Sequence, residues 1–201
     1  MLHWISVVKL AHIVAIAMDG AARITPKTNL PFNFGPASTR DLVLFTSERP
    51  GRDPPQGEKI SAAQCQPQID FFKANAVNNV LVLLDENELE HYQAPGLLQL
   101  YESAGIQVHI QPMGEPGASQ RILSLISSVE KQQGKIAAHC THGVGRSGRV
   151  AAGWVVARYN QSPLDATNEV MDFAAEKGIE RLGHNDKLQT WLGDSNLAVN
   201  V

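Results

Sequence analysis

The densest signal in the chain is the stretch KIAAHCTHGVGRSG, which spans residues 135–148. It opens with a short apolar run, residues 135–138, that is typical of a buried strand. A second apolar run, residues 150–158, follows the glycines and is typical of a buried helix. Backbone N–H groups converge in a loop between a strand and a helix, and the helix dipole adds positive charge there. The stretch therefore predicts an anion site.

This predicted anion site carries a cysteine and an arginine, Cys140 and Arg146, with five residues between them. The thiolate form of a cysteine is the nucleophile, and a helix N-terminus and a nearby cation both favour that form. The planar fork of Arg146 can hold two phosphoryl oxygens. Ser147 is placed to donate a hydrogen bond to the sulfur, and His139 to orient the cysteine from the strand side. The pattern predicts two-step phosphoryl transfer, in which a cysteinyl-phosphate forms and water hydrolyses it.

The five residues between the cysteine and the arginine are expected to bind the phosphate. Glycines in this segment allow the backbone to turn tightly and to approach a ligand. The histidine has two interpretations, a contact with substrate or an outward-pointing side chain. The predicted phosphate loop consists of Thr141, His142, Gly143, Val144 and Gly145.

The segment from His139 to Ser147 resembles the signature loop of the protein tyrosine phosphatase superfamily, which reads His-Cys-five residues-Arg-Ser/Thr. The stretch before it is similar to the dual-specificity branch, and most similar to the kinase-associated phosphatase family. This likeness covers roughly residues 65–192 and rests on residues 86–92, residues 97–101, Gly105-Ile106 and the loop at Pro112. The resemblance implies a metal-independent phosphatase that uses no cofactor and takes only water as co-substrate.

The resemblance also implies a proton donor for the leaving oxygen, since relatives place an aspartate on the loop after the preceding strand. The matching loop here, residues 111–118, has Glu115 as its only acid, 25 residues before Cys140. A positioned acid contributes about 10²–10⁴ in rate. Asp85 is the second candidate because it ends the neighbouring strand. His184 stands where some relatives hold a polar residue that orients the attacking water, with a cap or surface role as the alternative.

Strands and helices are predicted to alternate along most of the chain. This order indicates a single α/β domain, a mostly parallel central sheet flanked by helices as in cysteine-dependent phosphatases. The signature loop then lies at the carboxyl end of its strand, where such folds bind ligands. The expected strands are residues 42–45, 80–84, 106–110 and 135–138, and the expected helices begin at Pro67, Pro95, Ser119, Val150, Pro163 and Asn185. The acidic run at residues 85–90 is interpreted as a solvated face, and residues 24–40 and 47–57 as loops.

Length and composition favour one globular domain, with 201 residues, 43% apolar and 18% charged. A net charge of −3 provides no general attraction for nucleic acid or a membrane surface, so the expected partner is a phosphorylated protein or peptide. Two cysteines are too few for a disulfide framework, and a catalytic thiolate needs reducing surroundings, which favours the cytoplasm. Residues 1–30 are predicted to be an N-terminal extension before a phosphatase domain at residues 31–201. A signal peptide is the alternative for the apolar start.

Three functions remain open at this point. The favoured one is a dual-specificity-like protein phosphatase acting on phosphotyrosine, with phosphoserine and phosphothreonine as further substrates. The second is a phosphatase of a non-protein substrate, an RNA 5′-phosphate or an inositol phosphate. The run His139–Gly143 also resembles RNA 5′-triphosphatases of the superfamily, but those carry asparagine where this chain has Gly145, and the loop has no lysine to meet extra inositol phosphates. The third is a catalytically weak phosphate-binding module.

Overall fold

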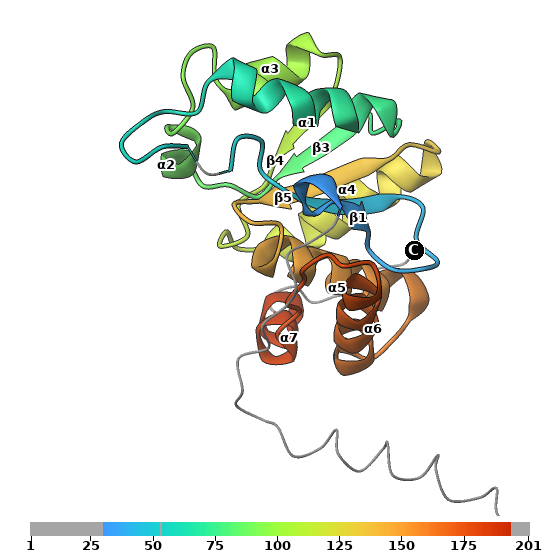
Figure 1. The fold of residues 1–201 in the computed structure, drawn as a ribbon. Coiled ribbons are helices and arrows are strands. Elements are labelled where there is room, and N and C mark those ends of the chain that lie inside the picture. The colour runs from blue at the N-terminus through green and yellow to red at the C-terminus, as the bar shows by residue number, and fades with distance from the viewer. Residues whose placement is uncertain (1–29, 53, 194–201) are drawn as a thin grey trace, which may run out of the picture.

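The structure, a computed structural model, describes residues 30–52 and 54–193 (Figure 1). The predicted N-terminal extension, residues 1–30, lies outside the described residues except for Leu30. A five-stranded sheet forms the centre, in the order β1-β2-β5-β3-β4. Four strands run parallel, and β1 is antiparallel to β2 at one edge. The strands are β1 Gly35–Pro36, β2 Leu44–Glu48, β3 Asn79–Val82, β4 Gln107–Ile110 and β5 Ile136–Cys140.

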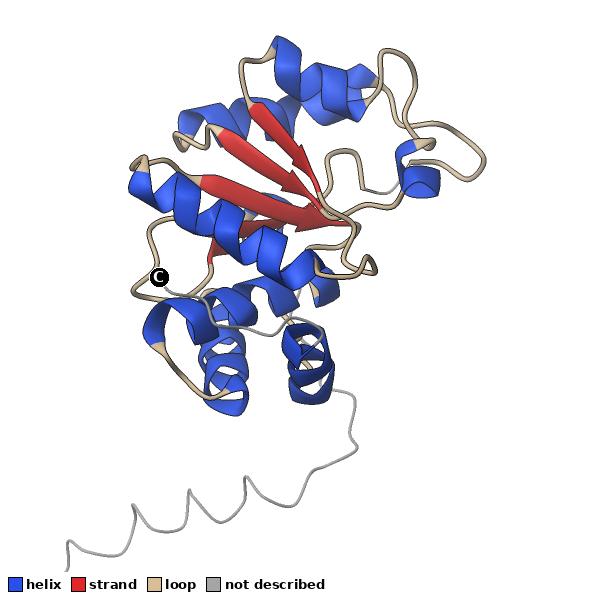
Figure 2. Cartoon of the chain, turned by 180° about the vertical axis from the view of Figure 1, so that it is seen from behind, coloured by secondary structure: helices blue, strands red, loops and turns tan. Residues whose placement is uncertain are grey.

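Helices cover both faces of this sheet, as Figures 1 and 2 show from opposite sides. On one face α1 and α3 pack over a core that includes Phe72, Tyr101 and Val80. On the other face α4 and α5 pack over a core that includes Ile122 and Trp154, and α6 and α7 contact the outer side of α5. The helices are α1 Ala62–Ala74, α2 Glu86–Leu89, α3 Leu97–Ser103, α4 Ala118–Lys131, α5 Gly145–Tyr159, α6 Pro163–Glu176 and α7 Asn185–Gly193. The predicted α/β domain with a mostly parallel sheet is confirmed.

One predicted helix start is confirmed and another is wrong. Ser162 caps α6 by accepting from the Asp165 N–H, with Pro163 in the first helical position as predicted. In α1 the predicted start at Pro67 is wrong. The helix begins five residues earlier, at Ala62, because Ser61 forms a capping box with Gln64.

Other boundaries also differ from expectation. The helix expected to begin at Val150 begins five residues earlier, at Gly145, so that the end of the signature loop already forms the first turn of α5. The helix expected to begin at Pro95 begins at Leu97, with Gly96 at its N-cap in a positive-φ conformation (φ 91°). The strand expected at residues 42–45 is displaced toward the C-terminus, because β2 pairs with the whole of β5 from Leu44 to Glu48. Parallel pairing with the buried β5, rather than local pattern, sets the ends of β2.

Within residues 30–52 and 54–193, no helix combines the length and the apolar character that crossing a membrane requires.

Candidate active site

The signature loop joins the end of β5 to the start of α5 at the carboxyl edge of the parallel strands. Cys140 is the last residue of β5 and is only 4% exposed. Its Sγ atom lies 3.0 Å from the hydroxyl of Ser147, which is fully buried in the first turn of α5. The two side chains predicted to act together are therefore in hydrogen-bond contact.

The loop presents its N–H groups because its carbonyl groups are engaged elsewhere. The carbonyl oxygens of residues 141–144 all accept hydrogen bonds from groups outside the predicted phosphate loop. The N–H groups of Arg49 and Leu182 bond the first and last of them, and the side-chain amide of Asn33 bonds the middle two. Within the described part of the chain, no N–H group of residues 141–144 donates a hydrogen bond. These four donors are free for an anion, as are those of the first turn of α5.

Gly143 allows the loop to lie directly against β2. Its φ is +72°, and a Cβ atom there would lie 2.5 Å from the backbone nitrogen of Glu48. Backbone atoms cannot yield as a flexible side chain does, so any larger residue would displace the loop from the sheet. The hydrogen bonds from Asn33 and the close packing of Gly143 thus both fix the orientation of the carbonyl groups of residues 142 and 143.

The guanidinium of Arg146 is held by a carboxylate that the sequence analysis did not single out. Glu88 of α2 accepts two hydrogen bonds from it, at 2.5 Å from Nη1 to Oε2 and 2.7 Å from Nη2 to Oε1. The hydroxyl of Thr141 accepts from Nη2 at 2.9 Å and donates to Glu88 at 2.6 Å. The Leu83 carbonyl accepts from Nη1 at 2.9 Å. This is a bidentate pair with two further anchors, the geometry in which an arginine side chain is most firmly oriented.

The ionisation of both partners reflects this contact. Hydrogen bonding from Arg146 is the main reason why the pKa of Glu88 falls to about 2, with Thr141 contributing in the same direction. The pKa of Arg146 rises in turn, mainly through its hydrogen bonds to Glu88. Both terminal nitrogens of Arg146 are occupied, while its Nε has no partner within residues 30–52 and 54–193. With its pKa lowered in this way, Glu88 is ionised at neutral pH and the ion pair is intact.

The interpretation of residues 85–90 as a solvated face is wrong for Glu88. The N-cap Asp85 N–H also donates to the Glu88 carboxylate at 3.0 Å. An Asp-x-x-Glu pattern directly after a buried strand signals a helix start. Because β3 and β5 are neighbours in the sheet, that helix start lies at the same edge as the signature loop. The signal was present, but its position beside Arg146 depended on strand order.

The side chain of His139 does not lie beside the sulfur of Cys140. It is fully buried on β5, and successive side chains of a strand point to opposite faces, so it lies on the face away from Cys140. Its Nε2 is 3.0 Å from the hydroxyl of Tyr101 on α3. Burial lowers the pKa of His139 to about 3, so the ring is neutral at physiological pH. The side chain fixes the end of β5 against α3.

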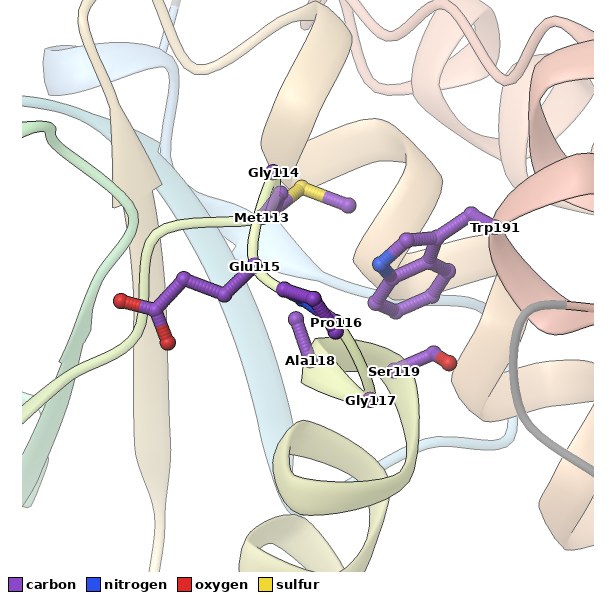
Figure 3. Close-up of a pocket in the computed structure, with 8 residues that line it drawn as sticks. All are labelled: Met113, Gly114, Glu115, Pro116, Gly117, Ala118, Ser119 and Trp191. Atoms are coloured by element: carbon purple, nitrogen blue, oxygen red, sulfur yellow. The ribbon is translucent and has the colours of Figure 1, made fainter.

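The two candidate proton donors follow neighbouring strands, Asp85 after β3 and Glu115 after β4. Glu115 is half-exposed, and its carboxylate accepts from Arg121 at 2.7 Å. Figure 3 shows this carboxylate pointing away from Trp191 and from the cavity that the loop lines. Asp85 caps α2 and is close enough to Arg146 to contribute to the raised pKa of that guanidinium. Neither carboxyl lines the cavity around Cys140.

That cavity has a volume of about 300 Å³ and is lined by the signature loop, the start of α5, and residues at and just before the start of α7. The exposed His142 and His184 both line it, the first from the loop and the second from just before α7. Two cations that the sequence analysis did not consider, Arg149 and Lys187, complete its wall. Across the described ranges, no three His, Cys, Asp or Glu side chains are grouped as they would be to bind a metal ion.

We predict that Glu88→Gln lowers kcat/KM for an aryl phosphate by about tenfold or more, because the amide cannot accept two charge-assisted hydrogen bonds from Arg146. Both KM and kcat are expected to worsen, since the guanidinium serves binding and turnover. Steady-state kinetics measures the effect, and thermal denaturation shows whether the variant is folded. Glu86→Gln is the matched control, as Glu86 is exposed on the same short helix. Equal losses in the two variants would refute a role for Glu88.

A family model described as Cyclin-dependent kinase inhibitor 3 (CDKN3) matches residues 58–166, more than half of the chain. The chain is 29% identical to Cyclin-dependent kinase inhibitor 3 of Rattus norvegicus over 140 residues, 63% of this chain and 66% of the relative. It is 27% identical to the Homo sapiens protein of the same name over 123 residues, 58% of each chain. The chain thus spans about three-fifths to two-thirds of the length of these curated relatives.

Solved structures show the same fold. A kinase associated phosphatase with serine in place of its catalytic site cysteine superposes with a TM-score of 0.60 at 23% identity, covering 74% of this chain and 84% of that one. A putative protein tyrosine phosphatase from Leishmania major superposes with a TM-score of 0.55 at 20% identity, covering 82% and 98%. At such identities the likeness concerns architecture, while the family match concerns the sequence that surrounds the loop. The chain belongs to the cyclin-dependent kinase inhibitor 3 family.

Proposed function

We propose that this protein is a cysteine-dependent, dual-specificity-like protein phosphatase that hydrolyses phosphotyrosine through a cysteinyl-phosphate. The observation that carries the proposal is the environment of the Cys140 sulfur. It lies 3.0 Å from the Ser147 hydroxyl, at the base of a loop whose four N–H groups are free while all its carbonyl groups are bonded away. Such a site stabilises both a thiolate and the phosphoryl group that it attacks.

The reaction follows in two balanced steps. In the first, Cys140 Sγ attacks phosphorus, the bond from phosphorus to the leaving oxygen breaks, and that oxygen takes a proton from an acid. In the second, water attacks phosphorus and gives a proton to the carboxylate that acted as acid in the first step, the sulfur–phosphorus bond breaks, and phosphate leaves. Arg146 binds one phosphoryl oxygen through its Nε–H and a second through Nη2, which for this must exchange its hydrogen bond to Thr141 for the phosphoryl oxygen. Ser147 donates to the sulfur as it departs.

The loop residues have defined roles in this proposal. The N–H groups of Thr141, His142, Gly143, Val144 and Gly145 bind the equatorial phosphoryl oxygens. His139 acts as a positioning residue through Tyr101. His142 and His184, both at the rim of the cavity, contact the group that carries the phosphate.

Glu115 is the proposed proton donor, with Asp85 as its rival. The loop of Glu115 follows β4, whose carboxyl end lies at the same edge of the sheet as Cys140. For this role the carboxylate must leave Arg121 and turn over the cavity. An exposed ion pair of this kind contributes little to stability, so its loss is easily offset by contact with substrate.

We predict that Glu115→Gln lowers kcat by about 10²-fold for phosphoserine peptides but changes it little for an activated aryl phosphate, whose leaving group needs no proton. Rates against a series of leaving groups measure this dependence. Asp85→Asn is the parallel variant and is expected to leave the dependence on leaving group unchanged. If Asp85→Asn changes the dependence on leaving group and Glu115→Gln does not, Asp85 is the acid.

The intermediate is the direct test of the proposed function. The full chain is mixed with a radiolabelled phosphotyrosine peptide, quenched in acid during turnover, and digested for mass spectrometry. Label is expected on Cys140. Cys65→Ala is the control for the other cysteine, which is buried in the core under α1. Turnover without label on Cys140 would refute the mechanism.

A phosphorylated protein is the proposed partner, in line with the relatives, which are named as inhibitors of a cyclin-dependent kinase. We place the protein in the cytoplasm, because both of its cysteines are free and the proposed nucleophile needs a reducing compartment. A panel that compares phosphopeptides with inositol phosphates and 5′-triphosphate RNA tests the substrate class. Preference for either non-protein substrate would replace the protein assignment.

A further inference from the structure

We propose that Arg121 is a positioning residue that holds the loop of Glu115, residues 111–117, in a resting position and thereby limits how readily the proton donor is used. This inference rests on the proposed function and concerns the control of its acid. The resting position is the one that the loop has in this structure. Arg121 holds it through the loop backbone and a second side chain as well as through the carboxylate of Glu115.

Three acceptors on the loop share the guanidinium of Arg121, which lies near the start of α4. Its Nε donates to the Gln111 side chain at 2.6 Å, its Nη1 to the Pro116 carbonyl at 2.8 Å and its Nη2 to the Glu115 carboxylate at 2.7 Å. Gly117 lies beside the guanidinium with a φ of +70°, and a Cβ atom there would be 3.5 Å from Nη1. One side chain therefore ties together the start of the loop, the acid and the end of the loop.

The resting position keeps the proposed acid away from the nucleophile. Figure 3 shows the carboxylate of Glu115 pointing away from Trp191 and from the cavity that the loop lines. Glu115 is not among the residues that line the cavity around Cys140. The carboxylate and the backbone beside it are thus both held in a withdrawn position.

The structure also offers the loop a second position. A cavity of about 360 Å³ lies between the loop and Trp191. The Nε1 atom of Trp191 is buried and has no hydrogen-bond partner among the described residues, and in Figure 3 the indole nitrogen faces the loop. Buried donors without an acceptor are rare in folded proteins, and an acceptor that arrives in another conformation accounts for this one.

Movement of the loop into this space brings Glu115 toward the nucleophile. A further cavity of about 340 Å³ is also lined by Met113 and Trp191, and it adjoins the cavity around Cys140. In the second position a loop carbonyl oxygen accepts from the indole, and Glu115 lies nearer to Cys140. The hydrogen bond gained at Trp191 offsets part of what is lost at Arg121.

The contacts of Arg121 suit a reversible hold. The side chains of Arg121 and Glu115 are 46% and 50% exposed, and an exposed ion pair contributes little to stability. The charge-assisted hydrogen bond to the Pro116 carbonyl adds to it. The second position is then the minor one, and a step that needs the acid is slowed in proportion to its population. Removing the hold raises that population.

The kinetic test compares a phosphoserine peptide with an activated aryl phosphate, which is the reference because its leaving group needs no proton. In the full chain, Arg121→Gln is expected to raise the ratio of the two kcat values, peptide over aryl phosphate, by about 3–10-fold. Arg121→Lys can keep one contact and is expected to give a smaller increase. In the Glu115→Gln background the increase is expected to disappear, because Arg121 acts through Glu115.

Arg158→Gln is the matched control, since Arg158 forms an exposed ion pair of the same kind with Glu130, at 2.8 Å. This variant is expected to leave the ratio unchanged, and cooperative thermal melting shows that each variant is folded. A lower ratio in Arg121→Gln would mean that Arg121 holds the loop in its working position. An unchanged ratio would mean that it exerts no hold. Either result overturns the proposal.

Tryptophan emission tests the hold without any turnover. In the ligand-free full chain, Arg121→Gln is expected to change the intrinsic emission, and the Trp191→Phe background is expected to abolish this difference. Unchanged emission in Arg121→Gln, or a difference that persists without Trp191, would overturn the second position. If emission changes as expected but no variant hydrolyses the aryl phosphate, the hold is supported and the proposed function is wrong.

Discussion

Cys140→Ser is expected to lower turnover of an aryl phosphate by at least about 10³-fold, because a hydroxyl at this position is a far poorer nucleophile than a thiolate. Affinity for phosphate is expected to change little, since the free N–H groups of residues 141–144 and the guanidinium of Arg146 remain. The serine hydroxyl occupies less volume than the thiol and keeps the contact with Ser147.

Two measurements check this expectation together. Initial rates give the loss of turnover, and binding of a labelled phosphotyrosine peptide gives the retained affinity. Residual turnover within about tenfold of the unmodified protein would mean that another group carries out the attack. Loss of binding along with turnover, in a protein that still melts cooperatively, would instead show that the thiol shapes the loop.

Arg146→Lys is expected to lower kcat/KM by about 10²–10³-fold and to weaken phosphate binding as well. A lysine carries the same charge, but as a point charge it cannot bridge two phosphoryl oxygens. It also cannot satisfy Glu88 and Thr141 at once, as the two terminal nitrogens of Arg146 do. The substitution thus disturbs both the ligand contact and the anchor behind it.

Kinetic and binding measurements show whether the charge of Arg146 or its bidentate geometry accounts for the loss. If only the charge mattered, Arg146→Lys would bind phosphopeptide nearly as well as the unmodified protein, and the bidentate geometry would be unimportant. The double variant Arg146→Lys/Glu88→Gln is expected to be little worse than Arg146→Lys alone, because the role of Glu88 is exerted through the guanidinium. Clearly additive losses would give Glu88 a separate function.

The features that could be predicted from sequence are those set by neighbours in the chain. The order of strand, loop and helix around Cys140 depends on a continuous stretch, and the predicted start of α6 agrees with the structure. The contact between Cys140 and Ser147 follows from a spacing of seven residues across a tight loop. Local rules are sufficient for such features.

The features that escaped prediction depend on which strands and helices become neighbours. Glu88 meets Arg146 across 58 positions, and Asn33 meets the loop across more than a hundred. Lys187 arrives through the packing of α7 on α5, which two glycine contacts permit. In α1, Pro67 was predicted to be the first helical residue, although Ser61 caps the helix about one and a half turns earlier. No short window of the sequence contains the long-range contacts of Glu88, Asn33 and Lys187.

The groups that hold the loop carbonyls have a consequence for where the working unit begins and ends. Asn33, Arg49 and Leu182 all fall outside residues 58–166, the part with recognisable family sequence. So does β2, against which Gly143 packs. A fragment trimmed to residues 58–166 would keep Cys140 and Arg146. It would lack the groups of Asn33, Arg49 and Leu182 that bond the loop carbonyls and so hold the loop N–H groups in place. On the proposed function, we therefore expect the smallest active piece of this protein to extend beyond residues 58–166 and to run at least from Asn33 to Leu182.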